Sequence, residues 1–398
     1  MSAFPRRVAV TGVGMVSALG SDIATFWSGL LAGQSGIRPI TSLDTTSVKF
    51  KNGAEVSGFD PLSCLEQKEI ALLDRFAQYA YAAAKQAVDD AGAKLPSRTA
   101  VLTGCATGGA ITRDLSYYEL YRENKNRFHP MTIPRVMESA AASLISIKFG
   151  VKGPVFNVTS ACASSSHAIG QALFMLQAGY VDAAITGGAE ALFSLGLLKA
   201  WEGIRVVAPD TCRPFSRDRQ GMILGEGAGM LVLEDLERAQ ARGAHIYCEL
   251  AGCAMNADAA HWTQPSRESA IEAMQQAGLR PEEVGYINAH GTGTPINDPI
   301  EASAIAAAFP GRRIPVSSTK SMHGHALGAA GGIEAVATVL ALDRGVLPPT
   351  ANLTELDPAC AMIDVITEAR QVRVAGALSN SFAFGGLNCV LGFRAIEQ

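Results

Sequence analysis

The stretch Val155-Phe-Asn-Val-Thr159-Ser-Ala-Cys162-Ala-Ser-Ser-Ser-His167 runs from a β-branched segment through small residues into an alanine-rich region. Residues 155–159 have the pattern of a short buried strand, and residues 164–178 have the length and composition of a helix. A strand that passes directly into a helix is part of a β-α-β unit. The stretch therefore predicts an α/β protein with a largely parallel or mixed sheet.

The same alternation continues along the chain. The predicted strands are 7–11, 100–103, 155–159, 183–186, 230–233, 284–288, 314–317 and 390–393. The predicted helices are 70–91, 164–178, 267–277, 299–308 and 332–342. Strands that alternate with helices in this way favour repeated β-α-β units over an all-β or all-α fold.

The two halves of the chain resemble each other in outline. Strand 155–159 leads through a small-residue turn into a helix, and strand 314–317 leads through a Gly/His-rich turn into another. This indicates an internal duplication, with an N-terminal half over residues 1–250 and a C-terminal half over residues 251–398. No low-complexity linker separates the halves, so we expect them to pack as one body. Residues 105–135 predict a polar and aromatic excursion over the surface, where sites or subunit contacts are often covered.

Composition excludes several classes of function. Of the 398 residues, 48% are hydrophobic and 18% charged, and the formal net charge is −4. This suits a well-packed α/β protein and gives no electrostatic reason for binding nucleic acid or an anionic membrane. A local basic group of Arg213, Arg217 and Arg219 could still meet an acidic protein partner.

The chain shows no feature of export or membrane insertion. No signal-peptide pattern follows the early arginines, and no apolar run approaches the ~20 residues of a membrane span. The eight cysteines have no C-x-x-C spacing, which argues against a zinc site, and they are expected to be reduced. We therefore expect a cytoplasmic protein without a membrane partner.

Cys162 is the first candidate for chemistry. A thiol in the first turn of a helix faces unpaired N–H groups and the positive end of the helix dipole, so the sequence predicts a favoured thiolate. Most intracellular cysteines are buried structural residues, however, and this segment alone leaves both interpretations open.

A second candidate is Asn288-Ala-His290-Gly-Thr292-Gly-Thr294-Pro, at the end of a predicted strand. The histidine could point into a cleft, and the two threonine hydroxyls could hold a polar ligand. The alternative is an ordinary loop histidine. The glycines do not form a dinucleotide or P-loop motif.

A third candidate is Lys320-Ser-Met-His323-Gly-His325, which follows another predicted strand. His323 and His325 would share a face if this segment were extended. Metal binding is the rival interpretation, but no carboxylate or thiol lies at ligand spacing. Glu334 could form an ion pair with Lys320, or it could be a carboxylate stabilised by a helix N-terminus.

The fourth candidate is Ser379-Asn-Ser-Phe382-Ala-Phe384-Gly385-Gly386. Two glycines after Phe384 permit close approach of the backbone, with free N–H donors, to a ligand. A hairpin turn is the simpler interpretation. Each candidate is ambiguous alone, but a nucleophile, two imidazoles, a lysine and a glycine-rich loop together suit a thioester carbon–carbon condensation.

The combination of T-S-A-C-A-S-S, H-G-T-G-T-P, S-T-K-S-M-H-G-H-A-L-G-A-A-G-G and N-S-F-A-F-G-G resembles the elongating β-ketoacyl-acyl-carrier-protein synthases of the thiolase-like superfamily. The resemblance runs through nearly the whole chain. It implies a thiolase-like α/β fold with two duplicated halves in a layered α-β-α-β-α arrangement, assembled as a dimer. It also implies decarboxylative Claisen condensation of an acyl group with malonyl-acyl carrier protein.

The resemblance further implies the roles of individual residues. Cys162 would accept the acyl group, with its own N–H and that of Phe384 as the oxyanion hole. His290 and His325 would be the active-site histidines, Lys320 the preceding lysine and Phe384 a gate for the extender. Thr292 and Thr294 would hold the phosphopantetheine arm, and Thr107 would set the depth of the acyl pocket.

No metal or redox cofactor is implied for the reaction, since phosphopantetheine is carried by the partner acyl carrier protein. The second chain would be another copy, giving a homodimer, or a chain-length-factor-like subunit, giving a heterodimer. Some relatives hold a structural cation at positions that match a set of polar residues here: Asn288, Glu301, Glu334, Ser379 and Asn380.

Three neighbouring classes fit less well. A thiolase would need a second cysteine, and Cys389 lacks the usual glycine-rich surroundings. Initiating synthases have asparagine where this chain has His325. A chain-length-factor subunit would lack the nucleophile Cys162.

Two departures from the family pattern suggest a specialised pathway. Ala383 and Leu387 alter the loop that would carry the gate, and Thr107 occupies the position associated with pocket depth. We therefore expect nodulation-type, polyene or other type II polyketide assembly as alternatives to housekeeping fatty-acid synthesis.

Overall fold

The computed structural model describes residues 5–92 and 94–396. Within these ranges, eleven strands form one sheet in the order β12-β10-β9-β14-β15-β8-β1-β7-β6-β4-β5. The strands of the first half are β1 (Val8–Ser17), β4 (Ala100–Gly104), β5 (Val155–Val158), β6 (Ala183–Glu190) and β7 (Gly227–Asp235). Those of the second are β8 (Cys248–Ala257), β9 (Val284–Asn288), β10 (Pro315–Ser317), β14 (Gly376–Ala383) and β15 (Leu387–Arg394), with β12 (Asp364–Val365) at the edge.

The same strand order occurs twice. The first half runs β1-β7-β6-β4-β5 across the sheet, and the second runs β8-β15-β14-β9-β10. The pairing directions also correspond: the first two pairs in each half are antiparallel and the next two are parallel. This repeat confirms the duplicated architecture. The two halves join where Ala9 and Val10 of β1 pair with Glu249 and Cys248 of β8.

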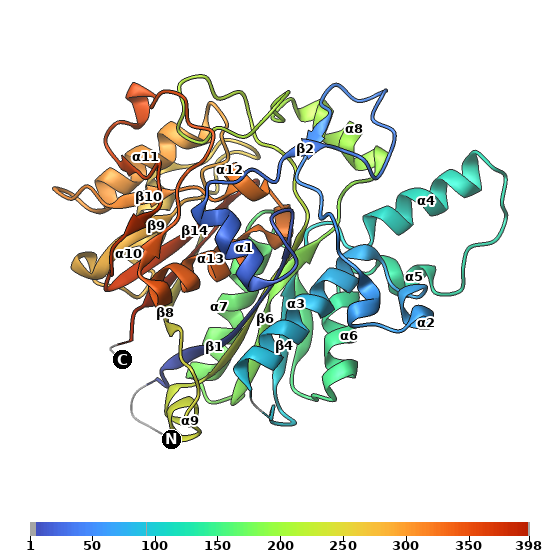
Figure 1. The fold of residues 1–398 in the computed structure, drawn as a ribbon, viewed down its shortest axis with the longest axis horizontal. Helices are drawn as coiled ribbons and strands as arrows, with labels where there is room; N and C mark the ends of the chain where they lie inside the picture. The colour runs from blue at the N-terminus through green and yellow to red at the C-terminus, as the bar shows by residue number, and fades with distance from the viewer. Residues whose placement is uncertain (1–4, 93, 397–398) are drawn as a thin grey trace.

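Helices cover the half-sheets in layers (Figure 1). The central helices α7 (Ser164–Gln177) and α13 (Ala330–Arg344) contact strands of both halves and each other. The helices α3 (Arg75–Ala91) and α6 (Ala140–Phe149) pack on the first half, and α10 (Arg267–Gln275) and α11 (Asn297–Ala308) on the second. The result is the predicted α-β-α-β-α arrangement.

Small residues permit the central helices to approach closely. A Cβ atom on Gly331 of α13 would lie 2.1 Å from Ser166 Oγ of α7, closer than real contacts allow. The glycine in the first turn of α13 is therefore required by packing as well as by any chemistry there.

The predicted helix 70–91 is wrong in its first part. The structure has a short α2 (Gln67–Ile70) and begins α3 at Arg75. Asp74 is extended, and its carboxylate accepts hydrogen bonds from Phe76 N and from Thr112 N. This N-cap stabilises a new helix start, because an aspartate side chain satisfies a donor that the first turn leaves free.

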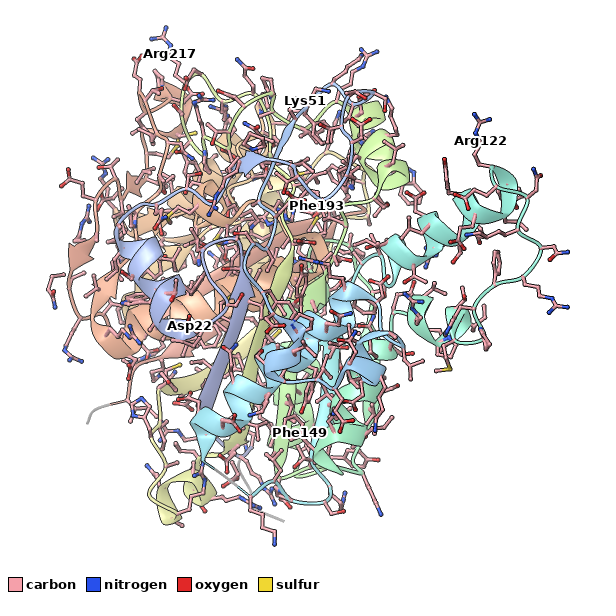
Figure 2. The ribbon with its side chains drawn as sticks, turned by 45° about the vertical axis from the view of Figure 1, so that its right-hand side comes forward. Asp22, Lys51, Arg122, Phe149, Phe193 and Arg217 are labelled. Atoms are coloured by element: carbon pink, nitrogen blue, oxygen red, sulfur yellow. The ribbon has the colours of Figure 1, made fainter. Side chains whose placement is uncertain are left out.

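Most of the remaining helices lie at the surface: α1 (Ile23–Leu31), α4 (Ala110–Tyr121), α5 (Thr132–Val136), α8 (Leu195–Ile204) and α9 (Leu236–Ala241). The short helix α12 (Lys320–His323) is instead fully buried. Helix α4 projects away from the body, with Arg122 near its outer end (Figure 2). Residues 105–135 thus form the predicted surface excursion. In the described part of the chain, no helix has the length and apolar character needed to cross a membrane.

The predicted division after residue 250 falls inside β8. Because β8 occupies the place in the second half that β1 occupies in the first, we propose to place the boundary before Cys248.

Candidate active site

The candidate residues meet at the carboxyl ends of four strands. Cys162 follows β5, His290 follows β9, His325 follows β10 and Phe384 follows β14. A cavity of about 400 Å³ opens there, and these four side chains line it together with Thr292 and Thr294. The duplicated halves therefore contribute different groups to one cavity: the thiol comes from the first half, and both imidazoles come from the second.

Cys162 lies on a strained turn rather than inside a helix. The preceding residue, Ala161, has φ +49°, and α7 begins only at Ser164. Ala163 N and Ser164 N donate to Ser160 O and Ala161 O within this turn. The sequence-based placement of Cys162 in the first helical turn is thus wrong, because the chain needs this left-handed residue to turn from strand into helix.

Burial raises the pKa of the Cys162 thiol to about 11, although the Lys320 cation and the N–H groups of Phe384 and Cys162 favour the thiolate. Only 7% of Cys162 is exposed. The loss of solvation is larger than the stabilisation by nearby positive charge and N–H donors. The predicted resting thiolate is therefore wrong: the group at rest is a thiol.

This pKa predicts how Cys162 reacts with an alkylating agent. Since only the thiolate is nucleophilic, alkylation of Cys162 by iodoacetamide should accelerate about tenfold per pH unit between pH 7 and 10. Peptide mapping identifies the alkylated residue, and free glutathione serves as the control. A rate for Cys162 that levels off near pH 8 would contradict a raised pKa.

The two imidazoles pack edge to face in the cavity. The ring centroids of His290 and His325 are 5.4 Å apart, with an interplanar angle of 86°. Burial lowers the pKa of both rings well below the usual value, and the Lys320 cation adds to the effect. Both histidines are therefore neutral at physiological pH.

Hydrogen bonds determine which nitrogen of each neutral ring carries the proton. His325 Nδ1 accepts a hydrogen bond from Leu327 N at 3.2 Å, and His290 Nδ1 lies 3.4 Å from Lys320 Nζ. Because an ammonium can only donate, both Nδ1 atoms are acceptors and both protons lie on Nε2. The cavity is consequently lined by two neutral N–H donors.

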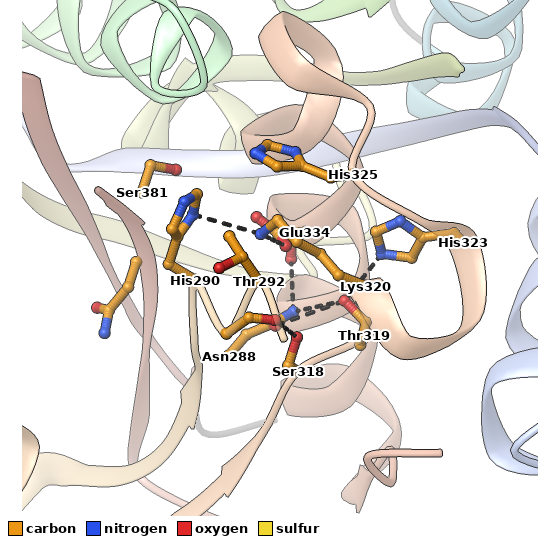
Figure 3. A network of polar contacts seen from close by, with 12 residues as sticks. Asn288, His290, Thr292, Ser318, Thr319, Lys320, His323, His325, Glu334 and Ser381 are labelled. Atoms are coloured by element: carbon orange, nitrogen blue, oxygen red, sulfur yellow. Dashed lines mark hydrogen bonds and ion pairs between the residues drawn. The ribbon is translucent and has the colours of Figure 1, made fainter. Parts of the chain in front are cut away.

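A buried ion pair lies next to the His290 ring, on the side of its Nδ1 atom. Lys320 and Glu334 are both fully buried, and Lys320 Nζ donates to Glu334 Oε1 (Figure 3). The predicted Lys320–Glu334 pair is therefore present in the structure. Burial raises the pKa of Glu334 to about 7, an effect that the nearby Lys320 cation opposes.

His323 does not share a face with His325. It ends helix α12, and its Nε2 lies 3.0 Å from Thr319 Oγ1 (Figure 3), so its side chain is not among those that line the cavity. Burial lowers the pKa of His323 to about 3. The prediction failed because the segment is helical rather than extended. Within residues 5–92 and 94–396, no group of three or more His, Cys, Asp or Glu side chains could hold a metal.

The two threonines line the same cavity. Thr292 Oγ1 and Thr294 Oγ1 are 3.0 Å apart, and Thr294 Oγ1 accepts from Asn297 N. Glu301, on α11, accepts from His290 N at 2.8 Å and from Gly291 N at 2.7 Å. This carboxylate orients the loop that carries His290, a function that spacing alone does not reveal.

Phe384 is at the tip of a hairpin between β14 and β15. The hairpin turns through Gly385 and Gly386, with φ +82° and +68°, so the simpler interpretation of this segment is also correct. The Phe384 ring stacks on Trp201, with centroids 6.2 Å apart and planes at 29°. Gly385 N donates to Trp262 O at 2.7 Å. Neither tryptophan carried a signal in the sequence that pointed to this site.

Thr107 lies outside the set of residues that line this cavity. Its hydroxyl and N–H both donate to the buried carboxylate of Glu190, which also accepts from Ala106 N and Gly328 N. Thr107 therefore donates hydrogen bonds to a buried carboxylate that also accepts one from the second half, at Gly328 N. Its expected influence on acyl-pocket depth stays a proposal.

The basic group Arg213, Arg217 and Arg219 is not a free positive patch. Each guanidinium forms an ion pair, with Asp210, Glu355 and Asp357 respectively. Neighbouring carboxylates thus offset the charge of each arginine, and contact of this group with an acidic partner stays a prediction.

The residues of the possible cation set lie close together behind the cavity. Ser379 pairs with Asn288 across β14 and β9, and Asn380 Nδ2 donates to Glu301 Oε1. Three oxygens of the set, Glu334 Oε2, Ser379 Oγ and Asn380 Oδ1, are buried without a hydrogen-bond partner. Carboxylate, hydroxyl and amide oxygens suit a hard cation, so the donor chemistry of this set fits one.

Comparisons with known proteins agree with this geometry. Residues 5–239 match the family model "Beta-ketoacyl synthase, N-terminal domain", and residues 247–354 match "Beta-ketoacyl synthase, C-terminal domain". The chain is 44% identical to "Nodulation protein E" of Rhizobium sp. (strain N33), covering 98% of this chain and 100% of that protein. It is 41% identical to "3-oxoacyl-[acyl-carrier-protein] synthase 2" of Synechocystis sp., covering 98% and 99%.

Solved structures of ketosynthases are also similar to this chain over nearly its whole length. "The ishigamide ketosynthase/chain length factor" matches with a TM-score of 0.94 and 36% identity, over 99% of this chain and 100% of that one. The complex AntDE:AntF, described as a type II PKS acyl-carrier protein with its ketosynthase bound to the hexaketide, matches with a TM-score of 0.88 and 30% identity, over 99% and 100%.

Proposed function

Because the chain belongs to the β-ketoacyl synthase family, we propose that Cys162, His290 and His325 carry the family's reaction in this protein. The protein is a transferase that condenses an acyl group with malonyl-acyl carrier protein, in fatty-acid or polyketide synthesis. The observation that supports these three residues most strongly is their convergence on one cavity, with both Nε2–H donors directed by buried hydrogen bonds.

The first step is acyl transfer to Cys162. The thiol attacks the acyl thioester of the carrier, a bond forms between Cys162 Sγ and the acyl carbon, and the bond to the pantetheine sulfur breaks. The thiol proton leaves with the pantetheine sulfur, so no net charge is produced. The N–H groups of Cys162 and Phe384, which already interact with Sγ, are placed to stabilise the tetrahedral oxyanion.

The second step is decarboxylation of the malonyl group. Loss of CO2 leaves an enolate whose negative charge develops on the thioester oxygen. Two Nε2–H donors stabilise that charge, and burial keeps both rings in this neutral form. The enolate carbon then attacks the acyl carbon on Cys162, and the released thiolate takes a proton from solvent.

Other residues of the cavity position the substrates. We assign Thr292 and Thr294 to the phosphopantetheine arm, because their hydroxyls are adjacent and line the approach to His290. Phe384 would act as the gate, and its ring must leave Trp201 to admit the malonyl group. The carrier supplies the phosphopantetheine, and the solved ketosynthase complex with an acyl-carrier protein supports such a partner here.

The surface supports assembly with a second chain. Strand β5 ends the sheet, which leaves one edge unpaired within this chain. The nearby excursion exposes large apolar side chains, with Tyr121 77% and Ile133 68% exposed. Since monomers seldom expose so many neighbouring apolar groups, we propose that a second chain covers this face. We propose a homodimer, since a chain that holds Cys162, His290 and His325 together needs no separate catalytic chain, and a chain-length-factor-like partner is the alternative that the next experiment distinguishes.

The dimer can be tested by light scattering. The protein expressed alone should have the mass of two chains, and Ile133→Asp on the excursion should shift it toward one chain by burying a charge in the interface. Met362→Asp, at an apolar residue that is 41% exposed elsewhere, is the matched control. A wild-type protein that is monomeric alone and pairs only with a co-expressed homologue would contradict the homodimer and indicate a heterodimer.

We also propose a specialised pathway rather than housekeeping fatty-acid synthesis. The support is the altered gate loop at Ala383 and Leu387 together with the 44% identity to a nodulation protein. In parallel assays, the range of accepted acyl chain lengths should differ from that of a housekeeping synthase 2. Identical ranges would remove the basis for this proposal.

A further inference from the structure

A buried carboxylate of the first half contacts a turn of the second half. Glu190, the last residue of β6, is fully buried, and its Oε2 accepts hydrogen bonds from Gly328 N at 3.0 Å and Ala106 N at 2.8 Å. Its Oε1 accepts from Thr107 N at 3.1 Å, from the Thr107 hydroxyl and from the Cys105 thiol. Since every one of these groups donates, together they favour the ionised carboxylate, which only accepts.

The same turn supplies the hydrogen bond to the His325 ring. Leu327 N donates to His325 Nδ1 at 3.2 Å, and this is the one polar contact of the ring among the described residues. Leu327 has φ +44°, a left-handed conformation that a non-glycine residue keeps only where the surrounding structure enforces it. The direction of the Leu327 N–H therefore depends on the contacts that hold this turn, and the next residue, Gly328, makes them.

Two side chains of the first half hold Gly328. Its N–H donates to Glu190, and its carbonyl oxygen accepts from Ser165 Oγ of α7. A Cβ atom at Gly328 would lie 2.3 Å from Ala106 N and 2.6 Å from Glu190 Oε2, which is closer than real contacts allow. The glycine thus permits the carboxylate to reach the backbone of the turn.

We propose that Glu190 is a positioning residue for His325: together with Ser165 it fixes the turn at Gly328, so that the Leu327 N–H stays directed at Nδ1 and the ring proton stays on Nε2. The proposal rests on the proposed role of His325 in stabilising the enolate. If the bond at Nδ1 is lost, the proton can move to Nδ1, and Nε2 then presents a lone pair instead of a donor. Glu190 is not among the residues that line the cavity, so it acts through the turn.

The first test is the replacement of Glu190 by alanine. Decarboxylation of malonyl carrier protein, measured as ¹⁴CO2 release, should fall by about 10²-fold, the loss that a small misplacement of a reacting group can cause. The fall should be in kcat, with little change in KM, because the donor is lost only where the enolate forms. Glu190→Gln should recover part of the rate, since its amide oxygen can still accept from Gly328 N.

Glu234→Ala is the matched control for the loss of a buried carboxylate. Glu234 is buried on the neighbouring strand β7, where it accepts from Thr11 Oγ1 and Arg242 Nη2 and has no described contact with the turn. The folded fraction of this variant should decarboxylate malonyl carrier protein nearly as fast as the wild type. A loss as large as that of Glu190→Ala would contradict a specific role of Glu190.

The decisive measurement is a double-mutant cycle with each histidine. If Glu190 acts through His325, Glu190→Ala should have almost no further effect in a His325→Ala background and should keep its full effect in a His290→Ala background. An equal loss in both backgrounds would overturn the positioning role while leaving the function of His325 intact. A wild-type rate in His325→Ala alone would remove the proposed function of that ring, and this inference with it.

A milder variant tests the same turn if Glu190→Ala does not fold. Ser165→Ala removes only the hydroxyl that donates to Gly328 O. It should lower decarboxylation by about three- to tenfold, the typical value of one hydrogen bond, and this loss should likewise vanish in the His325→Ala background. A wild-type rate in Ser165→Ala, or a loss that persists without His325, would count against the proposal.

Discussion

Replacement of His290 by alanine should lower the rate of condensation by about 10²–10³-fold, the loss typical of removing one donor from a charge-stabilising site. The acyl group should still be transferred to Cys162, because the oxyanion hole for that step uses the backbone N–H groups of Cys162 and Phe384. His325→Ala should behave in the same way. Release of ¹⁴CO2 from malonyl carrier protein measures decarboxylation, and mass spectrometry measures acylation.

The structure provides a matched histidine for comparison. His323 is also buried, but it contacts Thr319 and does not line the cavity. The folded fraction of His323→Gln should therefore decarboxylate malonyl carrier protein nearly as fast as the wild type. If acylation of Cys162 fell as far as condensation in both His290→Ala and His325→Ala, the assignment of these rings to the enolate would be wrong.

The second large effect concerns the ion pair behind His290. Lys320→Met should lower the free energy of unfolding by about 3–5 kcal/mol, because it leaves the Glu334 carboxylate buried without its cation. The double variant Lys320→Met with Glu334→Leu should recover much of this loss, since two apolar side chains can replace a buried pair. Urea unfolding of the single and double variants measures both changes.

The pH dependence of this effect has a defined sign. Burial raises the pKa of folded Glu334 to about 7, above its usual value of 4.5, so protonation favours the folded state. Stability from this group is present below pH 4.5 and is lost as the pH rises through about 7. Without Lys320, the charged form of Glu334 is even less favourable, because the cation that stabilises it is gone. The destabilisation by Lys320→Met should therefore be smaller at pH 5 than at pH 8, and an equal loss at both would contradict a charged Glu334.

Most of the fold could be predicted from the sequence, because the alternation of strands and helices is a local pattern. Strand β9 has the predicted bounds, Val284–Asn288, and the duplication follows from two similar strand-to-helix segments. The break before α3 was missed because it depends on a long-range hydrogen bond, from Thr112 N to Asp74, as well as on the cap. Such contacts leave no pattern within the segment itself.

The candidate site was predictable in its residue types but less so in its electrostatics. Cys162, His290, His325 and Phe384 were each ambiguous until their motifs were considered together, and the structure places all four on one cavity. The protonated state of the Cys162 thiol was not predictable, because burial by distant segments outweighs the local dipole. The tautomers of the two rings likewise depend on Lys320 and Leu327, whose positions only the fold determines.

The central claim is that Cys162 carries the acyl chain as a covalent thioester. Intact-protein mass spectrometry, followed by peptide mapping, tests it after incubation with acyl carrier protein loaded with a single acyl group and without malonyl carrier protein. The account predicts one added acyl mass per chain, on the peptide that contains Cys162, and its disappearance when malonyl carrier protein is added. An acyl mass on another residue, or a mass on Cys162 that malonyl carrier protein does not remove, would contradict the account.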